Sequence, residues 1–154
     1  MPEFDDLLEL IHGATLTAVG RAADLGILEF ASATGDGEIF LHLQCPFRIL
    51  YGGDLLIASG DMGYPSTTAG PRPTDPPGGS VFDERSLMLN QAIDRIRPMV
   101  TKATVELQGL LVVEMAPAFL LQVFPDCSGR VEMWRLFARG SSVHYGFPPA
   151  VFTE

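Results

Sequence analysis

The sequence predicts an α+β domain, a mainly antiparallel sheet of two pseudo-repeated β units with a short N-terminal helix and one longer central helix packed on a sheet face. Three observations predict it. Short apolar segments with period-two alternation recur between Gly, Pro and Asp residues, which is typical of strands and turns. Two segments have helical periodicity instead. The first half of the stretch Phe119–Phe137 also resembles an earlier stretch, Phe40–Ile49.

Length and composition predict one domain spanning residues 1–154. An apolar fraction of 47% is ample for a core without disulfides or metals. The chain carries 19 acidic against 10 basic residues, a formal charge of −9. Nucleic acid and anionic membranes require a basic footprint, so we expect neither as a partner. A basic protein partner fits this charge, and solubility alone is the alternative explanation.

The two cysteines, Cys45 and Cys127, are too few for a disulfide framework, which favours a reducing, cytoplasmic setting. The first residues are acidic and lack the basic start of a secretory signal. No apolar run approaches the roughly 18 residues that would span a bilayer. We therefore expect a cytoplasmic protein without a membrane segment.

The first half of the chain predicts one helix followed by strands. Phe4, Leu7, Leu8 and Ile11 form one helical face, so we expect a helix over Glu3–Ile11. Further strands are expected over these ranges: Ala14–Arg21, Leu25–Ala31, Glu38–Ile49 with Pro46 as an interruption, and Leu55–Ser59 after a turn at Tyr51–Asp54.

The segment Gly60–Ser80 has a different composition. Five of its 21 residues are Gly and five are Pro, with almost no large aliphatic side chains. Such a segment buries too little apolar surface to offset its ordering entropy. We expect a mobile insertion, with a partner-binding loop as the alternative.

The second half opens with the clearest helix, Asp83–Arg97. Asp83 is the expected N-cap, and Pro98 should end the helix because it disfavours a helical residue before it. Thr101–Ala116 should form strands with a hairpin partner at Leu110–Met115. Phe119–Phe137 should form two strands around a turn at Pro125–Gly129, and Ser141–Phe147 a last short strand.

An internal repeat is the second main prediction. Ala14-Thr15-Leu16 recurs as Ala103-Thr104-Val105, and the heptapeptide 40–46 recurs as 119–125. Each half would then consist of a hairpin followed by a strand and its antiparallel partner, and the central helix would join the two halves. A chance likeness between apolar strands is the alternative, because such strands resemble one another.

Residues able to carry chemistry are few. Cys127 is a nucleophile only if a base such as His144 lowers its pKa, and the neighbouring Asp126 acts in the opposite direction. The histidines and cysteines match no metal-ligand spacing, and no phosphate-binding loop occurs. We predict no catalytic residue, cofactor or metal. The alternative is a small-molecule-binding or hydrolytic domain with a pocket near Cys127 and His144.

Several stretches resemble a group of small uncharacterised bacterial proteins, similar in type to the immunity proteins encoded beside polymorphic toxins. They are IHGATLTAVGRAADL, FLHLQCPFRI, FDER and VFPDCSGRVEMWRLF. The resemblance implies a non-enzymatic domain that neutralises a toxin by direct binding. A structural subunit of a homo-oligomer is another alternative. We expect the partner-binding residues to be Asp5, Asp6, Glu9, Asp126, Glu132 and Trp134, although core packing is the alternative for Trp134.

Overall fold

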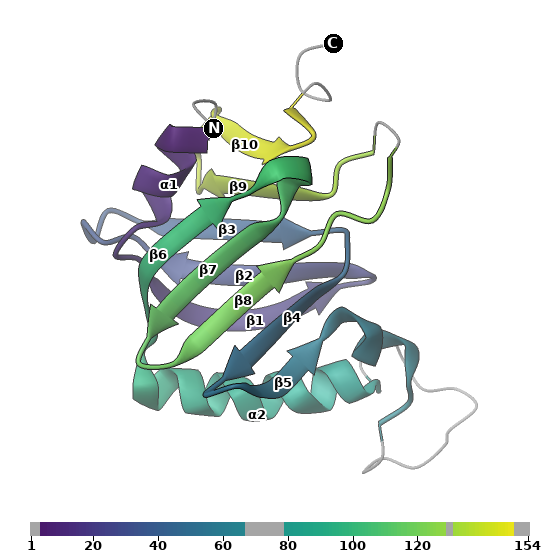
Figure 1. Ribbon diagram of the computed structural model, residues 1–154. Helices are drawn as coiled ribbons and strands as arrows, with labels where there is room; N and C mark the ends of the chain where they lie inside the picture. The colour runs from purple at the N-terminus through teal and green to yellow at the C-terminus, as the bar shows by residue number, and fades with distance from the viewer. Residues whose placement is uncertain (1–3, 67–78, 129–130, 150–154) are drawn as a thin grey trace.

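The structure is a computed structural model that describes residues 4–66, 79–128 and 131–149. These residues confirm the α+β class, with two α-helices and an antiparallel sheet of ten strands (Figure 1). The elements are α1 (Asp5–Ile11), β1 (Thr15–Ala22), β2 (Leu25–Ala31), β3 (Glu38–Leu43), β4 (Phe47–Tyr51), β5 (Asp54–Ala58), η2 (Ser59–Gly63), α2 (Val81–Ile96), β6 (Met99–Val105), η3 (Leu107–Gly109), β7 (Leu111–Ala116), β8 (Phe119–Val123), β9 (Trp134–Ala138) and β10 (His144–Phe147).

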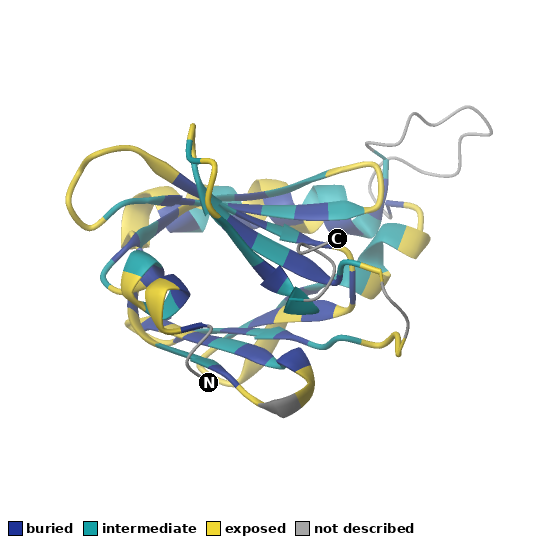
Figure 2. Cartoon of the chain, turned by 90° about the horizontal axis from the view of Figure 1, so that it is seen from above, coloured by how far each residue is buried: buried dark blue, intermediate teal, exposed yellow. Residues whose placement is uncertain are grey.

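The sheet has the strand order β10-β9-β3-β2-β1-β6-β7-β8-β4-β5. Its two halves meet at β1 and β6, whose register contains the single pair Thr15 and Met99. At this junction the sheet folds over, so that five strands lie in front of the other five in Figure 1. Buried side chains alternate along the strands, as the dark segments in Figure 2 show, and they form the core between the two layers.

The strand order has a pseudo-twofold symmetry. If each strand of the first half is replaced by its equivalent in the second half, and the reverse, the same order is read from the other edge of the sheet. The pairs of equivalent strands are β1 and β6, β2 and β7, β3 and β8, β4 and β9, and β5 and β10. A helix precedes each half, since α1 leads into β1 and α2 leads into β6. Each helix also packs against the first strand of the other half. The predicted internal repeat is therefore visible in the topology.

Hydrogen bonds fix the register of the repeat. The Thr17 hydroxyl donates to the Glu29 carbonyl at 3.0 Å, and the Thr101 hydroxyl donates to the Glu114 carbonyl at 3.2 Å. Each threonine lies at a bulge in its strand pair. Thr17 is therefore equivalent to Thr101. The predicted alignment of Ala14–Leu16 with Ala103–Val105 was wrong in register by five residues, since it would place Thr17 on Glu106 instead of Thr101.

The two central strand units were also predicted with the wrong pairing. Glu38–Ile49 is not one strand, because residues 44–46 carry the chain from β3 in one layer to β4 in the other. Likewise β8 and β9 are not a hairpin. Strand β8 pairs with β7 and β4, whereas β9 pairs with β3 and β10. Each half therefore places its last two strands in the layer begun by the other half.

The central helix α2 begins slightly earlier than predicted. Ser80 is the N-cap, and Asp83 is the third helical residue of a capping box in which each side chain bonds the other's backbone N–H. The helix ends at Ile96, and Arg97 adopts a left-handed conformation before Pro98. Phe82, Leu89 and Ile93 are buried and face the core, whereas Ile96 in the last turn is 39% exposed.

The predicted insertion 60–80 lies partly outside the described residues, which omit 67–78. Its beginning is ordered as η2, and Pro65 forms an isolated β-bridge with Ser80. The buried Ser66 hydroxyl donates to Glu84 of α2 at 3.0 Å. The two ends of the segment are therefore joined and fixed to the helix.

Candidate functional site: the crossover loop

The connection between β8 and β9, residues 124–133, is the clearest departure from the pseudo-twofold arrangement. We call it the crossover loop. The equivalent connection between β3 and β4 makes the same passage between layers with the three residues 44–46, whereas the crossover loop has ten. Its stems are held by equivalent bonds, from Gln44 N to the Met133 carbonyl and from Phe124 N to the Pro46 carbonyl, both 2.8 Å. The fold does not require its extra length.

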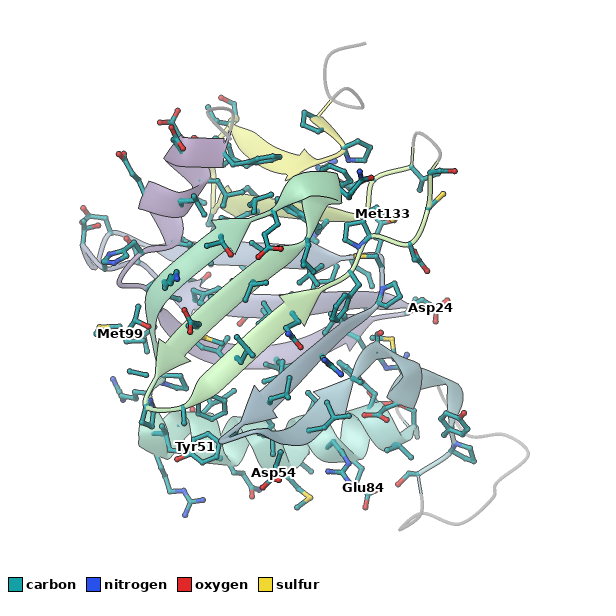
Figure 3. The ribbon with its side chains drawn as sticks, viewed as in Figure 1. Asp24, Tyr51, Asp54, Glu84, Met99 and Met133 are labelled. Atoms are coloured by element: carbon teal, nitrogen blue, oxygen red, sulfur yellow. The ribbon has the colours of Figure 1, made fainter. Side chains whose placement is uncertain are left out.

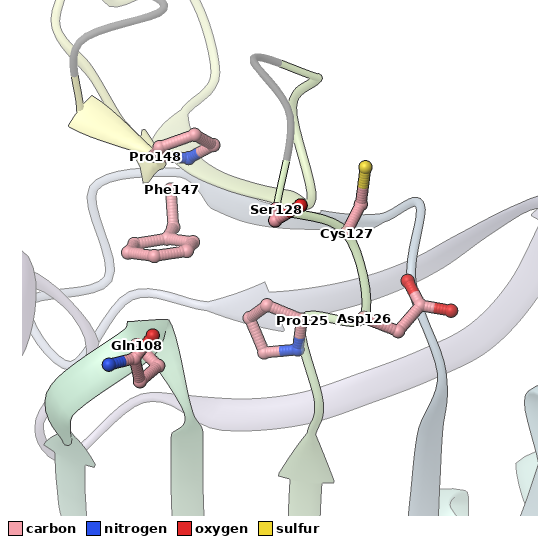
Figure 4. A pocket seen from close by; sticks show the side chains of 7 residues that line it. All are labelled: Gln108, Pro125, Asp126, Cys127, Ser128, Phe147 and Pro148. Carbon is pink, nitrogen blue, oxygen red and sulfur yellow. The ribbon is translucent and has the colours of Figure 1, made fainter.

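A cavity of about 530 Å³ lies beneath this loop. It is bounded by the loop, by the β6–β7 turn and by the end of β10, and Figure 4 shows the lining residues Gln108, Pro125, Asp126, Cys127, Ser128, Phe147 and Pro148. This volume lies within the usual range for ligand pockets. Gln108 has a φ of 69°, but Ala23 in the equivalent β1–β2 turn has a φ of 52°. The unusual backbone therefore belongs to the repeated turn and is not specific to the cavity.

The cavity wall next to β10 is rigid. The Phe147 ring stacks on Trp134, with centroids 6.4 Å apart and an interplanar angle of 19°. Trp134 is completely buried, and its indole N–H donates to the Gly109 carbonyl at 2.8 Å. Gly109 lies directly against the Phe147 ring, because a Cβ at this position would collide with it. These contacts hold the Phe147 ring in place at the cavity wall.

The crossover loop exposes both an apolar and an acidic side chain. Val131 of the crossover loop is 55% exposed, although it is a large aliphatic residue. Asp126 is exposed and forms no ion pair with any described residue. In Figure 4 its carboxylate lies on the far side of Pro125 from Phe147. This combination of an exposed apolar residue and an unpaired charge is typical of a contact surface.

Glu132 has a different environment from Asp126. It pairs with Arg135, and it accepts a hydrogen bond from Gln44 Nε2 at 2.8 Å. Its side chain is only 15% exposed. Glu132 therefore fixes the second stem of the crossover loop to the short crossing 44–46 and is poorly placed to contact a partner through its carboxylate.

The structure does not place Cys127 and His144 around one reaction centre. Cys127 lines the cavity, but its sulfur points away from the Phe147 ring in Figure 4. His144 does not line the cavity; its ring stacks on Phe137 with centroids 4.5 Å apart. Its two ring nitrogens lie 3.3 Å from Arg135 Nη1 and 3.2 Å from the Ser141 carbonyl. His144 is thus engaged on the outer face of β9 and β10.

Cys45, in the short crossing, is a buried thiol. Burial raises its pKa to about 12, and the nearby Asp126 carboxylate contributes to the rise. Cys45 and Cys127 are not joined in a disulfide. Cys45 therefore serves as a small core residue.

A second group of side chains lies on the outer face of β3 and β9. Phe137 contacts Phe40, His42 and His144 with centroid separations of 5.6, 5.0 and 4.5 Å. Burial lowers the pKa of His42, Glu132 opposes the decrease, and Arg135 and His144 add to it. All four rings are half-buried. Cross-strand packing accounts for this cluster, and sequence alternation alone did not reveal it.

The six residues predicted to contact a partner do not form one surface. Asp5, Asp6 and Glu9 are exposed on α1, on the opposite side of the molecule from the crossover loop in Figure 1. In Figure 3, Met99 lies on the side of the molecule where α1 is found, and Met133, at the base of the crossover loop, lies on the other side. Trp134 is buried, so the core interpretation is correct for this residue. Of the predicted set, Asp126 alone lies exposed at the cavity.

The sequence interpretation did not identify the cavity residues Gln108, Phe147 and Pro148 or the exposed Val131. The one signal that would have found them is the unequal spacing of the repeat, three residues against ten between equivalent strands. That signal required the correct register, which the sequence did not provide.

Among the described residues, no group of three or more His, Cys, Asp or Glu is placed to hold a metal ion. None of the helices in the described ranges is long and apolar enough to cross a membrane. Comparison with known proteins finds no matching family model, no similar curated protein and no similar solved structure. The resemblance to immunity-type proteins therefore stays a prediction.

Proposed function

We propose that this chain is a protein-binding domain of the immunity type, which neutralises a basic toxin in the cytoplasm by covering part of its surface. The observation that carries the proposal is the crossover loop. It is more than three times as long as the equivalent connection, it exposes Val131, and its Asp126 lines the cavity. Loops held by a rigid scaffold are where binding residues concentrate.

The charge of the chain supports a basic partner. A formal charge of −9 creates a negative field that attracts a positively charged protein and accelerates encounter. Neutralisation by covering requires shape and charge complementarity and no bond-making group. The rigid wall formed by Trp134 and Phe147 reduces the entropy lost on association.

The test uses a paired variant of the loop. The full chain is used as bait in a lysate of its source organism, the captured partner is identified, and its affinity is measured with purified proteins by calorimetry. The double variant Asp126→Asn/Val131→Ser should weaken binding by about 10- to 100-fold, since it removes one charge and one exposed apolar contact.

The matched control is Asp36→Asn/Val143→Ser. Asp36 is exposed, and Val143 is 54% exposed against 55% for Val131. Both control residues lie outside the crossover loop, so affinity should change less than about twofold. Equal losses in the two variants would reject the loop as the contact surface. A partner captured only as further copies of this chain, with a dimer mass by light scattering, would instead establish the homo-oligomer alternative.

A further inference from the structure

The cavity under the crossover loop has walls of two kinds. Pro125, Phe147 and Pro148 supply apolar surface, and Gln108 and Ser128 supply neutral hydrogen-bonding groups. Asp126 is the one charged residue among the seven that line it. No cation is present in this lining set to neutralise the Asp126 carboxylate.

This arrangement matches a side chain with an apolar stem and a cationic end. The stem of an arginine or lysine packs well against proline and phenylalanine surface while its charged end stays near water. Figure 4 shows the Phe147 and Pro125 rings on two sides of the cavity and the Asp126 carboxylate beyond Pro125, so the stem of such a side chain would run past Pro125 to reach the carboxylate. A guanidinium also finds acceptors in the Ser128 hydroxyl and the Gln108 amide oxygen.

We propose that this cavity is an anchor pocket that receives one basic side chain, preferably arginine, from the partner protein. The inference rests on the proposed function, since it names the contact by which the basic partner is held. Charge complementarity supports this occupant over an apolar one, because the net charge of −9 and the Asp126 carboxylate, which forms no ion pair with any described residue, both favour a cation.

The test needs no partner. N-acetyl-L-arginine amide is titrated into the ¹⁵N-labelled full chain, and amide shifts are followed by NMR. Saturable shifts should appear at Gln108, Ser128 and Phe147, with a dissociation constant of about 1–10 mM given the small size of the probe. N-acetyl-L-citrulline amide has nearly the same shape without the charge and should bind about tenfold more weakly.

Two variants complete the experiment. Asp126→Asn changes an exposed side chain, so it should leave the fold intact, weaken the arginine probe about tenfold and remove the difference between the two probes. Asp36→Asn, an exposed acid in the β2–β3 loop, should leave both affinities unchanged.

Equal binding of the arginine and citrulline probes would overturn the proposal in favour of a neutral ligand. Shifts confined to other residues, or none that saturate, would overturn it as well. Because this assay contains no partner, its failure rejects the anchor pocket alone, whereas the paired loop variants in the calorimetric assay test the binding function.

Discussion

The side-chain amide of Asn90 bonds both backbone polar groups of Val19. The Val19 N–H donates to Asn90 Oδ1 at 2.8 Å, and Asn90 Nδ2 donates to the Val19 carbonyl at 2.9 Å. Strand β1 pairs with β6 at Thr15 alone, so Val19 lies beyond the junction between the two halves. The Asn90 side chain of α2 therefore takes the place of a neighbouring strand, because it bonds the N–H and carbonyl that β1 leaves unpaired at Val19.

Asn90→Ala should lower the free energy of unfolding by about 2 kcal/mol, because it leaves the Val19 N–H and carbonyl without their partner. Urea denaturation measures the effect. Gln91→Ala, at the next and exposed position of α2, is the control and should change stability by less than about 0.5 kcal/mol. Equal effects of the two substitutions would show that the amide bonds contribute nothing.

Asp83 should make stability depend on pH. Burial alone would raise the pKa of Asp83, but hydrogen bonds from Arg21 and Ser80 outweigh it, so the pKa is lowered. A carboxyl with a depressed folded pKa stabilises the fold above its unfolded pKa of about 4, and this contribution is lost as pH falls through the folded value. Asp83→Asn should therefore cost about 2 kcal/mol at pH 7 and progressively less below about pH 4.

Urea denaturation between pH 2 and pH 8 measures this difference. Asp94→Asn removes an exposed carboxylate from the same helix and provides the control. A gap between Asp83→Asn and the unchanged chain that stays constant with pH would contradict the role of the charged Asp83–Arg21 pair, whose closest atoms are 2.7 Å apart.

The two thiols should react very differently. Cys127 is exposed, whereas Cys45 is 6% exposed with its pKa raised to about 12. At pH 8 the thiolate fraction of Cys45 is about 10⁻⁴, so alkylation of the native chain should modify Cys127 alone. Intact mass spectrometry counts the added groups. Cys127→Ser should leave the native chain unmodified, and two additions to the folded chain would contradict the prediction.

Gly109 should be irreplaceable for two separate reasons. Its φ of 79° disfavours any side chain, and a Cβ would collide with the Phe147 ring. Gly35 has a nearly identical φ of 78° but open space around it. Gly35→Ala should cost about 1 kcal/mol from backbone strain alone. Gly109→Ala should cost about 3 kcal/mol, since displacement of the ring adds to the strain.

Thermal or urea denaturation compares the two glycine variants. Their difference isolates the contact between Gly109 and Phe147 because the φ angles of the two glycines match. Similar costs for both variants would show that the Phe147 ring moves freely. The cavity wall would then be flexible rather than preformed.

Local structure was predictable where one segment carried its own signal. The helical face of Phe4, Leu7 and Ile11 is buried as expected, and Pro98 marks the end of α2. These signals depend on side-chain periodicity and backbone restriction within a few residues. Pro46 was also recognised as an interruption, although its meaning as a passage between two layers was not.

The pairing of strands was not predictable in the same way. Alternation at Leu121 or Leu136 shows that one face is buried, but it does not say which strand lies alongside. A hairpin between β8 and β9 would bury the same residues as the observed exchange. The candidate site was predictable only at Asp126, since Gln108 and Phe147 reach the cavity through contacts that are distant in sequence.

The exchange of strand pairs between the layers has a mechanical consequence. Strands β4 and β5 complete the layer begun by the second half, and β9 and β10 complete the layer begun by the first. Neither half can separate from the other unless two of its strands first lose their pairing with the strands of the other half. The molecule thus has no detachable subdomain, and disruption at either end should spread through the whole chain in a single cooperative event.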